Sequence, residues 1–271
     1  MKKIGFYPNT SKEQALAVAK DLISFVEVLG IECFVAPSKT PISEADFLVV
    51  LGGDGTMLRA ARETALYNIP LLGINIGKLG YLTDVEPDGA KDAIFSVING
   101  YYTTEKRMML QAVIGENNPP KPLIALNDFC IARGAYTRLL EFEIWVNDEY
   151  IESLSADGLI VCTPTGSTAY NLSAGGPILK PDAEMIAVTP ICPHALHVSP
   201  LVLSSKDQVT IKMTTDTTQT PGNIVSVDGE VFETKKCEHI TIKRSELNAT
   251  IIKTGEKSFF DVLRRKLIDK L

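Results

Sequence analysis

The 271-residue sequence predicts two domains of different fold class: an α/β domain over residues 1–101, completed by residues 250–271, and a β-rich domain over residues 102–249. Three observations predict this division. Apolar strands alternate with helical patterns through the first 100 residues, period-two alternation then dominates, and a helical pattern returns near the C-terminus. Buried strands separated by helices are typical of a parallel sheet covered on both faces, whereas period-two strands are typical of antiparallel sheets.

The elements of the first domain can be placed from apolar spacing and turn residues. Strands are expected at residues 3–7, 31–37, 46–53 and 69–76, and helices at residues 11–30 and 56–66. In the second helix Leu58, Ala61 and Ala65 recur on one face, and Gly30 suits the C-terminal cap of the first. The alternation predicts a Rossmann-like α/β domain.

Alternating segments define the second domain. They cover residues 101–114, 139–146, 150–154, 207–213, 223–229 and 238–244, with a turn at 147–149. We expect antiparallel strands in a β-sandwich-like arrangement.

The C-terminal segment is expected to be helical. Ser258 and Asp261 fit a capping box at its start. An apolar stripe follows, formed by Phe259, Val262, Leu263 and Leu267. Because a helix fits poorly into a β-sandwich, we expect this last helix to return to the first domain.

Composition and charge narrow the function classes. The net charge of −6 argues against a general nucleic-acid binder. The five cysteines are scattered without a CxxC pair, which fits reduced thiols. The N-terminus lacks the apolar core of a signal peptide, and no apolar run is long enough to span a membrane. We therefore expect a cytoplasmic protein that does not bind membranes.

The stretch DFLVVLGGDGTML, residues 46–58, carries the first candidate site. Three glycines surround Asp54 between a strand and a helix. The loop lacks the lysine of a P-loop and the spacing of the GxGxxG fingerprint. Glycines permit positive φ and a close approach of backbone amides to a ligand, and a helix N-terminus favours a phosphate.

Asp54 itself allows two interpretations. It could cap the following helix, since Asp is favoured at that position. It could instead be a base aimed at a hydroxyl beside a phosphate site, because phosphoryl transfer depends mostly on positioning and charge. A cap alone does not require glycine on both sides, which favours the functional interpretation.

Residues 155–181, SADGLIVCTPTGSTAYNLSAGGPILKP, form the second candidate site. A strand opens into a run of hydroxyl side chains, which suits recognition of base and ribose edges, although an ordinary polar loop has the same composition. Asn127 and Asp128 end an apolar run and could equally be a turn. Cys192, His194 and His197 lack a fourth ligand nearby, so no metal site is expected there.

Taken together, these stretches resemble the NAD kinase family. The matching blocks, in the family's order and spacing, are GGDG at 52–55, GINIGKLGYLTD at 73–84, Asn127–Asp128, DGLIVCTPTGSTAYNLSAGGPI at 157–178 and TPICPH at 189–194. The resemblance covers nearly the whole chain. GGDG alone is less specific, because diacylglycerol-type lipid kinases and phosphofructokinases carry similar loops.

The resemblance implies an activity and a set of roles. Members of the family transfer a phosphoryl group from ATP, or sometimes polyphosphate, to the 2′-hydroxyl of the adenosine ribose of NAD. A divalent cation, Mg²⁺, would arrive with the nucleotide, and a homotetramer is implied. Asp54 would be the proton acceptor. The substrate-binding residues would be Gly55, Asn127, Asp128, Arg138, Asp157, Thr168, Ala169, Tyr170, Asn171, Leu172, Ser173 and Glu230, and we add Arg59 as a candidate phosphate contact.

Three positions depart from the family pattern. Asp128 replaces the usual Glu, and Ser155 and Ser199 stand where Arg is common. These changes would affect affinity and ligand preference more than the reaction. Two other functions therefore stay open: a lipid or sugar kinase that shares the GGDG loop, and a pyridine-nucleotide-binding regulator that has lost catalysis. The hydroxyl-rich block and the lack of a basic amphipathic helix argue against the lipid kinase.

Overall fold

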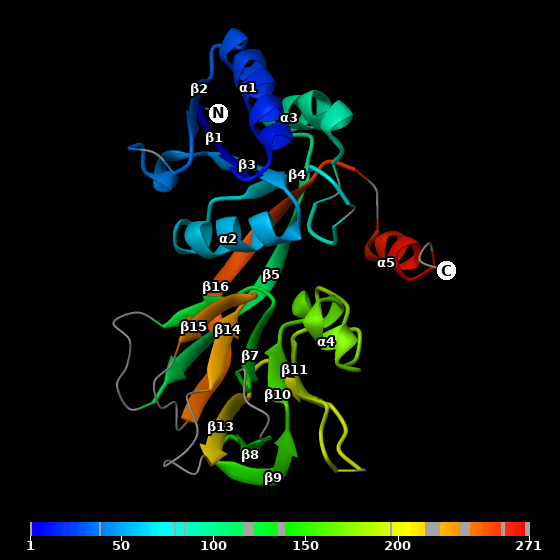
Figure 1. The fold of residues 1–271 in the computed structure, drawn as a ribbon. Helices are drawn as coiled ribbons and strands as arrows, with labels where there is room; N and C mark the ends of the chain where they lie inside the picture. Colours follow the sequence, from blue (N-terminus) through cyan, green and yellow to red (C-terminus); the bar gives the residue numbers. More distant parts are fainter. Residues whose placement is uncertain are drawn as a thin grey trace. The chain divides into compact units, whose positions relative to one another are not determined.

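The structure, a computed structural model, divides into two compact units, Met1–Arg107 with Asn248–Leu271, and Met108–Leu247. The chain passes between the units within two strands, β5 (Thr103–Ile114) and β16 (His239–Lys253) (Figure 1). The structure describes residues 2–37, 39–78, 80–83, 85–115, 122–134, 139–195, 197–214, 223–233, 239–255 and 258–268.

The first unit contains a parallel sheet with helices on both faces. Its strands are β1 (Lys3–Pro8), β2 (Glu32–Val35), β3 (Phe47–Gly52) and β4 (Leu71–Asn75), in the order β2-β1-β3-β4, followed by the end of β16. All of these pairings are parallel, as predicted. The helices are α1 (Glu13–Val28), α2 (Asp54–Thr64), α3 (Ala90–Ile98) and α5 (Phe259–Ile268), with short 3₁₀ turns at Ile42–Glu44, Ala65–Tyr67 and Pro87–Gly89.

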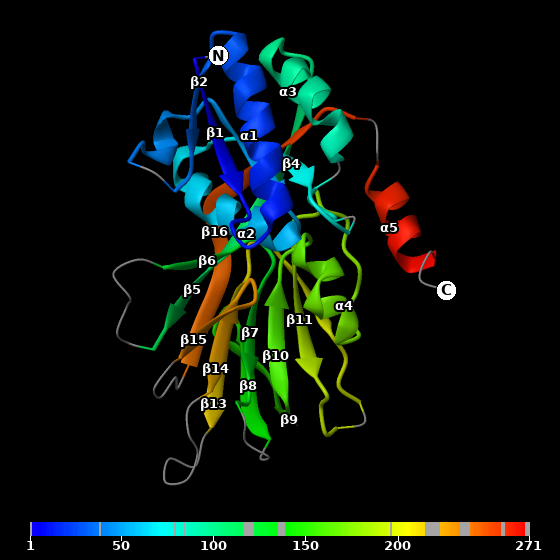
Figure 2. The ribbon, with the colours of Figure 1, turned by 45° about the horizontal axis from the view of Figure 1, so that its top comes forward.

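The alternating side chains of β4 show which helices cover each face of this sheet. α1 and α3 share one hydrophobic cluster with Leu72 and Ile74, and Figure 2 shows these two helices side by side. Gly73 lies between these residues and therefore faces the other way, where Met57 of α2 packs against it. The sheet is thus covered on both faces. Helix α3 was not predicted from the sequence.

The second unit contains two antiparallel sheets. Its strands are β6 (Leu123–Ala125), β7 (Asp128–Ala132), β8 (Leu140–Val146), β9 (Glu149–Ala156), β10 (Gly158–Cys162), β11 (Met185–Ile191), β12 (Leu201–Ser204), β13 (Gln208–Thr214), β14 (Ile224–Val227) and β15 (Glu230–Glu233), with two short helical segments at Gly166–Thr168 and α4 (Tyr170–Ser173). One sheet has the order β12-β11-β10-β7-β14-β15. The other is the continuation of the sheet of the first unit, and it runs from β16 through β13 and β8 to β9. One buried apolar cluster contains residues of both sheets, so the predicted β-sandwich-like arrangement is confirmed.

Two hairpin turns in this unit have left-handed backbone. Asn147 and Asp148 join β8 to β9 with φ of 50° and 67°, and Asp228 and Gly229 join β14 to β15 with φ of 50° and 81°. Such pairs of positive φ values are typical of two-residue hairpin turns, where Asn, Asp and Gly are preferred. The second turn positions the Asp228 carboxylate described below.

The C-terminal helix begins at the predicted capping box. The Ser258 N–H donates to the Asp261 carboxylate at 3.1 Å, and the Asp261 N–H donates back to the Ser258 hydroxyl at 3.2 Å. Val262 is buried, whereas Leu267, expected in the apolar stripe, is 45% exposed. The helix belongs to the first unit, as the sequence predicted. Among the described residues, none of the helices has the length and apolar character needed to cross a bilayer.

Candidate active site

The GGDG loop lies where β3 ends and α2 begins, at the carboxyl edge of the parallel sheet. Gly53 is the N-cap of α2, and its carbonyl accepts the N–H groups of Thr56 and Met57 at 2.9 and 3.2 Å. Ligands of open α/β sheets bind outside the carboxyl ends of the strands. The loop therefore occupies the expected edge for a phosphate-binding site.

Of the three loop glycines, Gly52 is the one that the surrounding space requires. None of Gly52, Gly53 and Gly55 has a positive φ, so the freedom of glycine to adopt such angles is not used in this loop. A Cβ on Gly52 would overlap the Thr56 side chain, whereas at Gly53 and Gly55 it would meet no atom within 4 Å. These two glycines leave open space beside the first turn of α2, and the N-terminus of a helix favours an anion.

The Asp54 side chain does not cap α2. Oδ2 accepts the N–H of Tyr81 and Oδ1 accepts the N–H of Leu82, both at 2.9 Å, and the N-cap position is occupied by Gly53. The capping interpretation of Asp54 is therefore wrong. The two amides hold the carboxylate in one orientation while its side chain stays 30% exposed. Because each oxygen has a second lone pair, the carboxylate can still accept a proton from a bound hydroxyl.

Gly80, Tyr81 and Leu82 lie close around this carboxylate. A Cβ on Gly80 would overlap Asp54 Oδ1, so only glycine fits there without a shift of the acid. Burial, and then the Asp54 charge, raise the pKa of the Tyr81 hydroxyl. The oxygens Asn75 Oδ1 and Thr83 Oγ1 are buried and have no hydrogen-bond partner within the described part of the chain.

Lys266 is a residue near Asp54 that sequence reasoning missed. Its Nζ lies 3.8 Å from Asp54 Oδ2 and 4.1 Å from the centroid of the Tyr81 ring. No motif links α5 to the GGDG loop, because the two are brought together only by the fold of the first unit. Arg59, the phosphate contact proposed from the sequence, is exposed on α2.

A second cluster of polar groups surrounds the Asn127–Asp128 pair in the other unit. The Asp228 carboxylate accepts three successive backbone N–H groups, from Leu126 at 3.0 Å, Asn127 at 2.7 Å and Asp128 at 3.2 Å. Asp228 was missed as a site residue, although a DG pair between two alternating strands indicates the hairpin that carries it. Its left-handed backbone turns the carboxylate toward these amides.

Asp128 is 5% exposed, and its pKa is shifted by its surroundings. Burial, and then the charge of Asp228, raise the pKa of Asp128 to about 7. A carboxyl group of this kind is partly protonated near neutral pH, and it can then donate as well as accept a hydrogen bond.

Several polar side chains of the 155–181 block support its loop from inside. Thr163 Oγ1 donates to the Leu126 carbonyl at 2.6 Å and accepts the Gly166 N–H at 3.1 Å. A Cβ on Gly166 would overlap the Asn127 backbone, so the block and the Asn127 segment are in close contact. Part of the run of hydroxyl side chains in this block therefore has a structural role.

Asn171 is fully buried and its amide is engaged on both sides. Nδ2 donates to the carbonyls of Ser167 and Pro177 at 3.1 and 3.0 Å, and Oδ1 accepts the Thr189 hydroxyl at 2.6 Å. The neighbouring candidates are more accessible: Tyr170 is 48% exposed, Ser173 is exposed, and Thr168, Ala169 and Leu172 are half-buried.

The remaining candidates lie at separate places in the second unit. Asp157 accepts from the Arg133 side chain, with Nε 2.5 Å from Oδ1, which supplies a cation close to the position where Ser155 replaces the usual Arg. Glu230 is exposed at the start of β15. Arg138 lies outside the described residues. In those residues, no group of three His, Cys, Asp or Glu side chains could hold a metal ion.

The structure thus divides the predicted site residues between the two units. The first unit holds Asp54, Gly55 and Arg59, and the second holds all the other described candidates. Within the second unit, hydrogen bonds join the Asn127–Asp128 pair to Asp228 and to Thr163.

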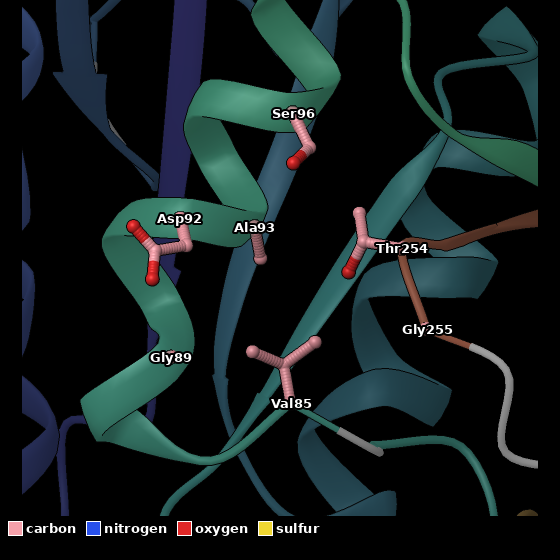
Figure 3. A pocket seen from close by; sticks show the side chains of 7 residues that line it. All are labelled: Val85, Gly89, Asp92, Ala93, Ser96, Thr254 and Gly255. Atoms are coloured by element: carbon pink, nitrogen blue, oxygen red, sulfur yellow. The ribbon is translucent and has the colours of Figure 1, made fainter.

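A pocket of about 270 Å³ lies elsewhere in the first unit, between α3 and the end of β16 (Figure 3). It is lined by Val85, Gly89, Asp92, Ala93, Ser96, Thr254 and Gly255. None of the site residues predicted from the sequence lines it, and the Asp92 carboxylate points away from Thr254. This pocket is not part of the candidate active site.

Comparison with known proteins identifies the family. Residues 35–102 match the model of the ATP-NAD kinase N-terminal domain, and residues 126–254 match that of the ATP-NAD kinase C-terminal domain. A protein named NAD kinase from Natranaerobius thermophilus is 37% identical over 283 residues, covering 98% of each chain.

Two solved structures share the fold. The yeast NADH kinase, crystallised with NADH, has a TM-score of 0.87 at 23% identity, over 98% of this chain and 87% of its own. An NAD kinase from Archaeoglobus fulgidus, crystallised with ATP, has a TM-score of 0.79 at 24% identity, over 100% of this chain and 98% of its own. The predicted fold class is confirmed, and the chain belongs to the NAD kinase family of enzymes.

Proposed function

We propose that this enzyme transfers the terminal phosphoryl group of ATP to the 2′-hydroxyl of the adenosine ribose of NAD, with Asp54 as the proton acceptor. The observation that supports this role is the geometry of Asp54. Its carboxylate is oriented by the Tyr81 and Leu82 amides, is accessible, and adjoins the open space left by Gly53 and Gly55.

In the proposed step, the 2′-hydroxyl loses its proton to Asp54 while its oxygen forms a bond to the terminal phosphorus of ATP. The bond from that phosphorus to the bridging oxygen breaks, and ADP leaves with the electron pair. The protein's contribution is positioning and charge stabilisation, which are the main sources of catalysis in phosphoryl transfer. The first N–H groups of α2 would face the phosphates of the donor.

We propose that NAD is held by the second-unit residues, in two classes. Asp128, Asp157, Tyr170 and Ser173 would contact the dinucleotide, together with Asn127, Thr168, Ala169, Leu172 and Glu230, and Arg138 stays a prediction from the resemblance. Asn171 would act by supporting the loop, because its amide is engaged by Ser167, Pro177 and Thr189. Gly55 and Arg59 would contact the donor phosphates.

The cation of this reaction would enter with the nucleotide. The described residues form no group of three acidic, His or Cys side chains that could hold a metal ion. We propose that Mg²⁺ binds to the ATP phosphates, and we assign it no step here. The use of polyphosphate, the homotetramer and the cytoplasmic location stay predictions.

The test is a product assay with the purified chain, NAD, ATP and Mg²⁺. The expected product is NADP, detected by an NADP-specific dehydrogenase, with the new phosphate assigned to the 2′ position by phosphorus NMR. Diacylglycerol replaces NAD in a parallel reaction and should give no product. Tight binding of NADP with no phosphorylation of NAD would overturn the proposal and favour the regulator.

A further inference from the structure

Lys266 is a half-buried cation in the first unit that none of the sequence motifs uses. Its side chain is 26% exposed, and its Nζ lies 3.8 Å from Asp54 Oδ2. The same Nζ lies 4.1 Å from the centroid of Tyr81, whose backbone N–H donates to that same oxygen. The ammonium group is thus held beside the acid that we propose as the base.

The position of Lys266 follows from how α5 is anchored. The capping box of Ser258 and Asp261 sets the start of the helix. Phe259 then packs near Tyr81, with ring centroids 6.4 Å apart, and Val262 is buried. Since residues four and seven positions apart lie on one helical face, Lys266 shares the face of these two anchors.

The other cations of this helix are placed differently. Arg264 is exposed and lies 3.7 Å from Asp261 on its own helix, and Arg265 is exposed. Lys266 is therefore distinguished from its neighbours by burial and by the group it approaches. The substitution R265M offers a matched control, because it removes the same charge from the same turn of the helix.

The contact between Lys266 and Asp54 is an ion pair. At 3.8 Å the ammonium is beyond hydrogen-bond range of Asp54, whose Oδ2 already accepts the Tyr81 N–H at 2.9 Å. Asp54 is therefore oriented by backbone amides, and Lys266 adds positive charge next to the acid. During transfer, negative charge spreads over the oxygens of the moving phosphoryl group, and a preorganised ammonium beside it stabilises that charge.

We propose that Lys266 is a further catalytic residue, whose ammonium contacts the terminal phosphate of ATP and stabilises it during transfer. Lys266 stays protonated throughout, and the proton of the acceptor hydroxyl goes to Asp54. This inference rests on the proposed function. It also explains why GGDG can lack the lysine of a P-loop: the cation comes from the C-terminal helix, which returns to the same unit.

The test compares K266M, K266R and the control R265M in the full chain. For each variant we would measure kcat, the KM for ATP and NAD, and the affinities for ADP and a non-hydrolysable ATP analogue. K266M should lower kcat by about 10²- to 10³-fold, as removal of one oxyanion donor does. It should lower the affinity for the ATP analogue much more than the affinity for ADP, and it should leave the affinity for NAD unchanged. K266R should recover part of the activity, and R265M should behave as wild type.

Two outcomes would overturn the inference. One is wild-type kcat in K266M, and the other is an equal loss of affinity for ADP and the ATP analogue, which indicates a structural role. If circular dichroism shows K266M to be unfolded, K266Q replaces it, and we expect the same fall in kcat and the same selective loss of affinity for the ATP analogue. Failure of the wild-type enzyme to make NADP would instead refute the proposed function, so the two failures are distinguishable.

Discussion

Asp54 and Asp128 are both acids next to a strand end, yet their surroundings differ in every respect. Asp54 follows β3, is 30% exposed and has a backbone amide on each oxygen. Asp128 begins β7, is almost fully buried, and its own amide is directed at another carboxylate, Asp228. The first environment leaves an oriented carboxylate accessible to a bound hydroxyl, whereas the second raises the pKa of Asp128 to about 7. The surroundings of an acid, more than its residue type, therefore decide its role.

A large effect is expected from moving Asp54 without removing it. In G80A the new methyl group would overlap Asp54 Oδ1 and displace the carboxylate. A misplacement of this kind costs about 100-fold in kcat/KM. The control is G89A, because a Cβ at Gly89 meets no atom within 4 Å. Equal kcat/KM values for the two variants would show that the orientation of Asp54 is unimportant.

A smaller effect is expected from removing the partner of Asp128. D228A leaves the amides of Leu126, Asn127 and Asp128 without their acceptor, which should lower the free energy of unfolding by about 1–3 kcal/mol. D148A is the control, since Asp148 also has a positive φ in a hairpin turn. Urea unfolding measures both. An equal loss of unfolding free energy in both variants would show that Asp228 matters only for its positive φ and not for its carboxylate.

The third prediction concerns pH. Because the pKa of Asp128 is raised in the folded state, its contribution to stability is fully present below the unfolded value of 3.8 and is lost as the pH rises through about 7. D128N should remove this dependence, which is about 1.4 kcal/mol per pH unit at most across that window. Urea unfolding at several pH values tests it. A pH profile identical to that of the wild type would contradict the assignment.

The sequence predicted more of the fold than of the site. The parallel sheet, the hairpin at Asn147–Asp148 and the capping box at Ser258 are local patterns, and each is confirmed. α3 was missed although Ala90, Ala93, Ile94 and Val97 are buried at helical spacing. The partners of Asp54 could not be read from the sequence, because two are backbone amides and the third is a lysine at the other end of the chain.

The most direct test of the account is the activity of D54N. This variant keeps a side chain of the same shape but cannot take the proton of the acceptor hydroxyl, so NADP formation should fall by about 10²- to 10⁴-fold. Calorimetry should show nearly unchanged binding of NAD, since the proposed NAD-binding residues belong to the second unit. Wild-type turnover by D54N would contradict the role of Asp54 as the proton acceptor.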